Sequence, residues 1–91
     1  MIFGRVYGVD IRIMIQILTY LDEVSVATIS NIARALGMSK RTVAKYVREM
    51  NVLGLVEVNV AGRAWYVRRG PKADAFTHLF SEVAMPRVVA R

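Results

Sequence analysis

The sequence predicts a small domain that is mainly α-helical and carries one β-hairpin, an α+β fold. Apolar residues recur at helical spacing in four segments, whereas two short segments on either side of Gly62 alternate apolar and polar residues, as β-strands do. The chain has 91 residues, 55% of them hydrophobic, which suits one domain with its own core. We therefore expect a single domain over residues 1–91, with a core at 9–70 and a last helix at 71–85.

The first predicted helix begins at Asp10, whose carboxylate can cap it, and runs to about Asp22. One apolar stripe consists of Ile11, Met14, Ile15, Leu18 and Leu21. A second ridge beside it consists of Ile13, Ile17, Tyr20 and Val24. Two ridges leave only a narrow polar strip, so we expect more of this helix to be buried than a small monomer can bury. The residues before Asp10 are expected to form an extended, strand-like arm.

The segment from Thr28 to Tyr46 predicts two short helices joined by a tight turn. The stripe of the first helix is Ile29, Ile32, Ala33 and Leu36. Gly37 follows that stripe, where a left-handed residue can end the helix without steric cost. Ser39 can cap the second helix, and Met38 and Val43 have the spacing of a hydrophobic staple across the cap. This arrangement is a helix-turn-helix.

The second helix of the pair, residues 39–50, has two unlike faces. Its apolar face consists of Val43, Tyr46, Val47 and Met50. Its outer face consists of Lys40, Arg41, Ala44, Lys45 and Arg48. The outer face is basic and contains no acidic residue, so it suits a groove of nucleic acid.

A β-hairpin is predicted over residues 55–69, because V-E-V-N-V and A-W-Y-V-R flank a turn at Ala61-Gly62-Arg63. With this hairpin, the chain resembles the winged helix-turn-helix transcription regulators of bacteria and archaea, including the MarR-like and ArsR-like groups. The resembling residues are Ile32-Ala33, Leu36-Gly37, Ser39, Thr42-Val43, Val47, Gly54-Leu55 and Gly62-Arg63. The resemblance spans roughly Asp10 to Arg69 and implies that the hairpin is a wing with its tip at residues 60–64.

The positive charge of this basic protein is concentrated in one window. The net charge is +6, yet residues 34–72 alone carry nine basic residues against Glu49 and Glu57, or +7. The rest of the chain holds four basic and five acidic residues, or −1. Because the positive field lies on the second helix and the hairpin, a polyanion is the expected partner.

We therefore expect the chain to be a sequence-specific regulator of transcription that binds double-stranded DNA, with helix 39–50 in the major groove. The expected contacts are Ser39, Lys40, Arg41, Thr42, Ala44, Lys45, Arg48, Arg63, Arg68 and Arg69. Arg41 is the candidate for reading guanine, Ala44 for touching a thymine methyl, and Lys45 and Arg48 for phosphates. Arg63 is expected in the flanking minor groove, and the two arginines that end the hairpin along the backbone.

A last helix is predicted to begin at Pro71 and to end at Pro86. Its apolar face, together with the second ridge of the first helix, exceeds what one small core can cover. We expect these two helices to build a homodimer through Ile13, Ile17, Tyr20, Phe76, Leu79, Phe80 and Val83. A two-fold dimer would place two recognition helices about 34 Å apart, one turn of DNA.

Several other functions lack support in the sequence. No catalytic motif or paired-carboxylate spacing appears, so we expect no enzyme. Without cysteine and with one histidine, His78, no cofactor or metal site is expected, and no small-molecule pocket is evident. No run approaches the ~20 apolar residues of a membrane span. No secretory signal is recognised, which leads us to expect a soluble, cytoplasmic, nucleoid-associated protein.

Two further interpretations stay open on the sequence alone. The alternative to DNA binding is a winged-helix module that binds a protein partner in a transcription, replication or membrane-remodelling assembly. A purely protein-binding module does not need the basic helical face, which distinguishes the two. Arginine outnumbers lysine ten to three, and cysteine is absent. This composition favours an archaeal or thermophilic source.

Overall fold

The computed structural model describes residues 9–84, with side chains up to Phe80, and has the predicted α+β fold. The elements of this part of the chain are α1 (Ile11–Val24), β1 (Val26–Thr28), α2 (Ile29–Leu36), α3 (Lys40–Val52), β2 (Val56–Ala61), β3 (Ala64–Arg69) and α4 (Ala73–Ala84). The expected order of three helices, a hairpin and a fourth helix is confirmed. The expected N-terminal arm and the helix end at Pro86 lie outside the described residues.

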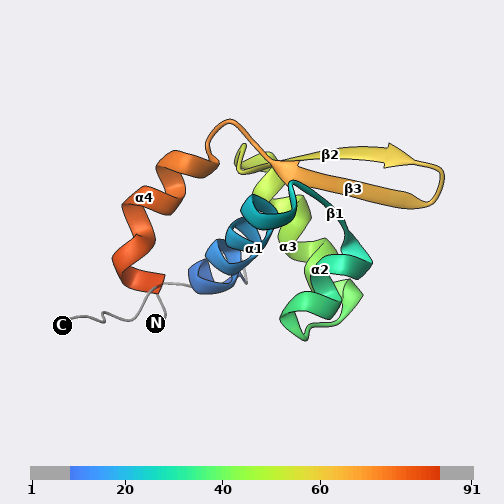
Figure 1. Cartoon of the computed structure of the whole chain (residues 1–91), viewed down its shortest axis with the longest axis horizontal. Coiled ribbons are helices and arrows are strands. Elements are labelled where there is room, and N and C mark those ends of the chain that lie inside the picture. Colours follow the sequence, from blue (N-terminus) through green and yellow to red (C-terminus); the bar gives the residue numbers. More distant parts are fainter. Residues whose placement is uncertain (1–8, 85–91) are drawn as a thin grey trace.

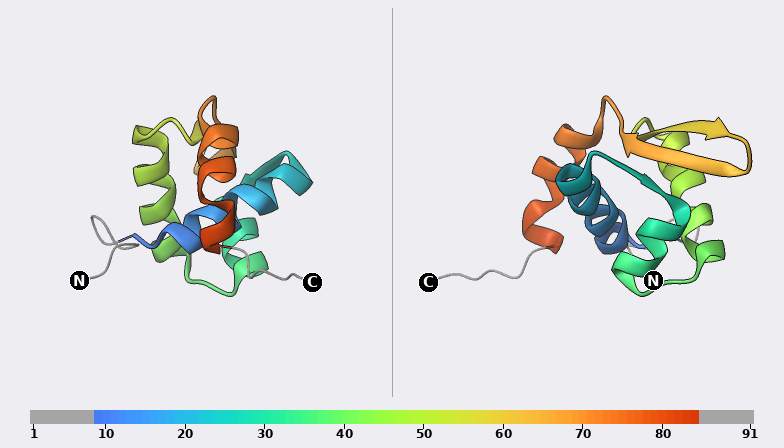
Figure 2. Two further views of the ribbon diagram at one scale, coloured as in Figure 1. Left: turned by 90° about the vertical axis from the view of Figure 1, so that its left-hand side faces the viewer. Right: turned by 45° about the vertical axis from the view of Figure 1, so that its right-hand side comes forward.

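The helices form two groups on either side of α1 (Figure 1). Helices α2 and α3 pack together on one side of α1, and α4 packs against its other side. The β2–β3 hairpin projects from the body on the side away from α4 (Figure 1). The two further views show α4 crossing the outer side of α1, far from the tip of the hairpin (Figure 2). No helix within residues 9–84 has the length and apolar character needed to cross a membrane.

The helix ends follow the local signals in the sequence. The Asp10 carboxylate accepts a hydrogen bond from the Arg12 N–H at 2.9 Å, which caps α1 as predicted, although α1 continues to Val24. Gly37 ends α2 with a φ of 68°, the left-handed conformation expected of it. The Ser39 hydroxyl accepts from the Thr42 N–H at 3.1 Å and so caps α3. The helix-turn-helix is confirmed.

The sheet has one strand more than the sequence predicts. Strand β1 pairs antiparallel with β3, giving the order β1-β3-β2. Ala27 lies opposite Val67, which lies opposite Val58 on β2, so these three side chains share the inner face of the sheet. Three residues are too few to show an alternating pattern, and only pairing with a distant segment makes them a strand. β1 therefore ties the root of the hairpin to the turn between α1 and α2.

The core is built from the inner faces of α1, α2, α3 and the sheet. Its fully buried side chains are Ile17, Leu18, Leu21, Ile32, Val43, Val47, Met50, Val56 and Val67. The expectation that Ile17 lies at a dimer interface is therefore wrong, because its side chain is 0% exposed within one chain. Ile13, Tyr20 and Phe76 are half-buried and pack against the same core. Because α4 folds back onto α1, one chain buries most of the ridge that seemed too large for a monomer.

Helix α4 begins two residues later than predicted. The Lys72 N–H donates to the Gly54 carbonyl at 3.0 Å, so this residue belongs to a turn and not to the helix. The first helical bond runs from the Phe76 N–H to the Lys72 carbonyl at 3.1 Å. Pro71 therefore lies in the turn that precedes α4.

Helix α3 is joined to the start of α1 by a hydrogen bond to one buried hydroxyl group. Tyr46 of α3 is 5% exposed, and its hydroxyl oxygen accepts a hydrogen bond from the Asp10 N–H at 2.8 Å. This N–H belongs to the cap of α1, where no carbonyl of the helix can accept it. The bond therefore fixes the start of α1 against the middle of α3.

We expect Tyr46→Phe to lower the free energy of unfolding by about 1 kcal/mol, because it leaves a partly buried N–H without its partner. Chemical denaturation would measure the loss. Tyr66→Phe is the matched control, since Tyr66 is 41% exposed on the outer face of the sheet. Equal stability of the Tyr46→Phe protein and the wild type would contradict a structural role for this bond.

Candidate nucleic-acid interface

An open groove of about 670 Å³ lies between α3, the start of α2 and the hairpin. Its walls are Thr28, Ile29, Ser30, Lys40, Arg41, Ala44, Arg48, Ala61, Arg63, Ala64 and Trp65. Five of these were predicted as DNA contacts from the sequence: Lys40, Arg41, Ala44, Arg48 and Arg63. The fold thus brings the basic face of α3 and the tip of the hairpin to one surface.

The helical wall of this groove follows from the spacing of its residues along α3. Arg41, Ala44 and Arg48 are separated by three and four residues, so they lie on one side of the helix. Val43, Val47 and the other residues of the apolar face are buried against the core, which turns the basic side outward. Ala44 lies between the two arginines and leaves space for a partner to approach the helix backbone.

The hairpin supplies the second wall. Gly62, with a φ of 62°, and Arg63 form the two-residue turn between the paired residues Ala61 and Ala64. Arg63 is exposed at this tip. Trp65 lies on the same face of β3 as the buried Val67, and its half-buried ring forms the floor of the groove next to the wing. Its place in the groove was not expected from the sequence.

The four cations of the groove have no carboxylate partner. No acidic residue lines the groove, and none of the ion pairs found within residues 9–84 includes Lys40, Arg41, Arg48 or Arg63. Four neighbouring positive charges repel one another, and an anion that enters the groove relieves this repulsion. The groove therefore has the charge and the open shape that a polyanion requires.

Three predicted contacts lie on α3 but outside the groove walls. Ser39 and Thr42 stand at the start of the helix, where the Ser39 hydroxyl donates to the Thr42 hydroxyl at 2.9 Å and accepts from the Thr42 N–H. Lys45 is exposed on the next turn. Because each of them is next in the chain to a residue of the groove wall, they are within reach of a ligand larger than the groove itself.

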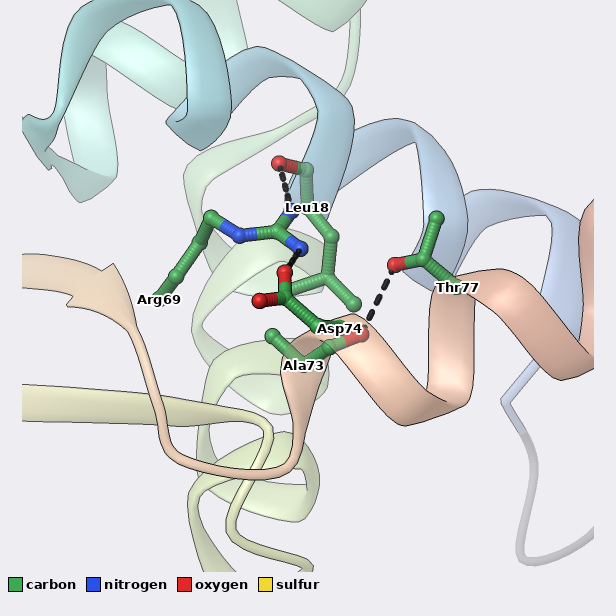
Figure 3. Close-up of polar contacts among 5 residues, drawn as sticks. All are labelled: Leu18, Arg69, Ala73, Asp74 and Thr77. Carbon is green, nitrogen blue, oxygen red and sulfur yellow. Dashed lines mark hydrogen bonds and ion pairs between the residues drawn. The ribbon is translucent and has the colours of Figure 1, made fainter.

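The two arginines at the end of β3 are directed away from the groove. Successive residues of a strand point to opposite faces. Arg68 is on the outer face of the sheet, 3.7 Å from the Glu57 carboxylate. Arg69 is on the inner face, where its guanidinium contacts the Leu18 carbonyl and Asp74 (Figure 3). Neither arginine lines the groove and each already has a partner within the chain, so their contact with the DNA backbone stays a prediction.

Residues at the start of α2 were missed by the sequence analysis. Thr28 and Asn31 form a capping box, in which each side chain accepts from the other's N–H at 3.1 Å. The T-I-S-N segment carries the signal for this cap. The place of Thr28, Ile29 and Ser30 beside Trp65 has no local signal, because it depends on how α2 meets the hairpin.

The chain belongs to the winged helix-turn-helix DNA-binding family: residues 12–57 match the model of that family. This range includes the helix-turn-helix and the start of the wing. No curated protein sequence matches the chain. Among the residues that the structure describes, no group of three or more histidine, cysteine or acidic side chains could hold a metal ion.

Solved structures with the same fold include two of a Mycobacterium bovis protein. The crystal structure is of a possible transcriptional regulatory protein, fragment 1–100, with 29% identity, a TM-score of 0.62 and coverage of 78% of this chain and 73% of that one. The solution structure is of a homodimeric winged helix-turn-helix DNA-binding domain, a possible ArsR-family regulator. Its identity is also 29%, its TM-score is 0.60, and the coverage is 78% and 63%. A protein of Archaeoglobus fulgidus, 18% identical, shares the fold with a TM-score of 0.64 over 80% of this chain and 81% of that one.

Arg63 and Arg68 both belong to the hairpin, but Arg63 lines the groove whereas Arg68 lies on the outer face of the sheet. We expect Arg63→Ala to weaken binding to duplex DNA by about 1.5 kcal/mol, the strength of a hydrogen bond to a charged group. The loss should be larger on A/T-rich flanks, where a narrow minor groove concentrates negative potential. Fluorescence anisotropy with duplexes that differ only in their flanks measures both effects.

Arg68→Ala is the matched control, because it removes the same charge from the outer face of the sheet. It should leave the preference for A/T-rich flanks unchanged. Equal losses for the two variants on every duplex would show that the wing supplies only general positive charge.

Proposed function

We propose that the chain is a sequence-specific regulator of transcription that binds double-stranded DNA as a homodimer. Helix 39–50 lies in the major groove, and the wing at residues 60–64 lies at the flanking minor groove. The observation that carries the proposal is the groove in which Lys40, Arg41, Arg48 and Arg63 meet without an acidic residue. The alternative, a module that only binds proteins, gives no reason for this concentration of unpaired charge.

The residues of the groove divide between reading bases and holding phosphates. Arg41 lies in the first turn of α3, the part of a recognition helix that reaches base edges. Its planar fork can donate two hydrogen bonds to one guanine, which is worth about 1 to 3 kcal/mol of discrimination. Arg48 lies two turns further along and approaches the backbone, where it adds affinity without sequence information. Ala44 between them suits contact with a thymine methyl group.

Two experiments test this function in order. Titration of a random duplex at two salt concentrations should show binding that weakens steeply with salt, since each phosphate contact releases counterions. Selection from a random library should then give a preferred site for the wild type. Arg41→Ala should lose about 1 kcal/mol or more of discrimination for that site, whereas Arg48→Ala should weaken all duplexes alike. Absence of binding at low salt would reject the function, and an unchanged site preference of Arg41→Ala would reject its role.

The homodimer is supported by apolar side chains that one chain leaves exposed. Leu79 on α4 is 72% exposed, and Val52 and Leu53 at the end of α3 are 83% and 50% exposed. Leu79 lies one turn beyond Phe76, which lines an apolar groove of about 480 Å³ together with Val52 and Leu53. Exposed apolar side chains beside an apolar groove are commonly covered by a second copy. The Mycobacterium bovis domain with 29% identity is homodimeric.

The proposed interface is therefore narrower than the sequence suggested. Phe76 and Phe80 are partly buried, with ring centroids 4.9 Å apart, so replacing them would disturb the packing of α4 itself. Ile13 and Tyr20 contribute only their exposed parts. Val83 belongs to α4, but its side chain is outside the part of the chain that the structure describes. Among the α4 side chains that the structure describes, Leu79 is the large apolar one that can face a second copy without serving the chain's own core.

We expect Leu79→Glu to give a folded monomer that binds an inverted-repeat duplex more weakly than the wild type does. The helix should persist, because a side chain exposed to this extent contributes little to the core. Light scattering and circular dichroism measure the two properties. Asn59→Glu adds the same charge on the outer face of the sheet and should remain dimeric. A Leu79→Glu protein that is still dimeric would place the interface elsewhere.

A regulator that binds DNA must be in the same compartment as the chromosome. We therefore propose a cytoplasmic, nucleoid-associated location. The Mycobacterium bovis protein with 29% identity is a possible transcriptional regulator, which supports a function in binding and not in catalysis.

A further inference from the structure

One guanidinium group connects three elements of the fold. Arg69, the last residue of β3, donates through Nη1 to the Leu18 carbonyl of α1 at 2.8 Å. Through Nη2 it donates to the Asp74 carboxylate in the first turn of α4 at 2.6 Å. Figure 3 shows this side chain between the two helices. Its exposed fraction is 19%, whereas that of Asp74 is 96%. We call the set of Arg69, Leu18 carbonyl and Asp74 the arginine clamp.

The position requires an arginine. The residue is paired with Val56 on the inner face of the sheet, so its side chain is directed toward α1 and not toward the DNA groove. A guanidinium presents several donors in a fixed plane and can serve a carbonyl and a carboxylate at once. A lysine ammonium ion is a single point on a flexible stem, so it would not hold both helices in one geometry.

The turn that follows Arg69 is also held in place. The Gly70 N–H donates to the Leu55 carbonyl at 2.8 Å, and the Lys72 N–H donates to the Gly54 carbonyl at 3.0 Å. A Cβ atom at Gly70 would stand 2.6 Å from the Gly54 carbonyl oxygen, so the backbones approach as closely as only glycine permits. The start of α4 is thus fixed to the root of the wing by the turn and to α1 by the arginine clamp.

We propose that Arg69 is a positioning residue for DNA recognition, in contrast to the backbone contact that the sequence suggested. The clamp fixes the direction in which α4 leaves the DNA-binding unit. Because α4 carries the proposed dimer contact Leu79, that direction determines the separation of the two recognition helices. The clamp therefore sets the spacing of the two half-sites that the dimer accepts. This inference rests on the proposed homodimeric, DNA-binding function.

A positioning role and a phosphate contact predict different results for the same variants. Loss of a phosphate contact lowers the slope of log affinity against log salt by about one and weakens all duplexes alike. Loss of the clamp leaves that slope unchanged and weakens only the duplex with the best spacing. Asp74→Asn is especially informative, because removal of one negative charge changes the net charge from +6 to +7. Electrostatics alone would then tighten binding to every duplex.

The experiment compares the wild type with Arg69→Lys, Arg69→Gln and Asp74→Asn on the selected inverted repeat. The duplexes carry the best half-site spacing or that spacing changed by one base pair. Arg69→Lys keeps the charge, Arg69→Gln keeps a polar side chain, and Asp74 is almost fully exposed, so all three proteins should fold; thermal denaturation and light scattering check the fold and the dimer. We expect each variant to lower the affinity ratio between the two spacings by about threefold, as suits the loss of a partly exposed ion pair, with an unchanged salt slope. Arg68→Lys is the control and should keep the wild-type ratio.

Two results would overturn this inference alone. One is a spacing ratio that stays as in the wild type in Arg69→Lys, together with a salt slope that falls by about one in Arg69→Gln, which removes the charge; this would make Arg69 a phosphate contact. The other is an Asp74→Asn protein that binds all duplexes more tightly with the same spacing ratio. A wild type that fails to bind DNA, or that binds as a monomer, would instead overturn the proposed function and this inference with it.

Discussion

The burial of α1 at the centre of the molecule is the constraint on which the other elements depend. Ile17, Leu18 and Leu21 are at most 1% exposed, and they contribute to a core shared by α2, α3 and the sheet. Helix α4 packs on the other side of the same helix (Figure 2). The DNA-binding unit and the proposed dimer helix are therefore built on one rigid element. A change in how α1 packs would alter both at once.

Polar contacts of α1 fix the angles that apolar packing leaves open. The cap of α1 donates to Tyr46 of the recognition helix, and the carbonyl of Leu18 accepts from Arg69 at the root of the wing. Hydrophobic burial is not directional, whereas a hydrogen bond at 2.8 Å permits little variation in geometry. These two bonds, at the start and in the middle of α1, help to define where α3 and the wing lie relative to each other.

The positive charges of the surface fall into two groups, those paired with a carboxylate and those that line the groove. Within residues 9–80, the cations of the groove have no carboxylate partner, whereas Arg12, Arg68 and Arg69 each lie beside a carboxylate. Paired cations contribute little to the long-range field, so the positive potential is concentrated where α3 and the wing meet. The family to which the chain belongs is defined by DNA binding, and this distribution agrees with that activity.

The sequence by itself determined the features that depend on near neighbours in the chain. Asp10, Gly37 and Ser39 act within one helical turn, and the turn at Gly62 joins adjacent strands, so all four were predicted correctly. The basic side of α3 followed from helical spacing alone.

Only the tertiary structure decided what depends on distant segments. β1 is a strand because β3 lies beside it, and Ile17 is buried because segments distant in the sequence pack against the apolar sides of α1. Arg68 and Arg69 are adjacent and equally basic, yet the pleat of β3 directs them to opposite faces, toward Glu57 in one case and Leu18 in the other. Thr28, Trp65 and Arg63 line one groove only because the start of α2 packs beside the hairpin. Local chemistry specifies the type of each element, whereas the partner of a side chain is specified only when the elements pack.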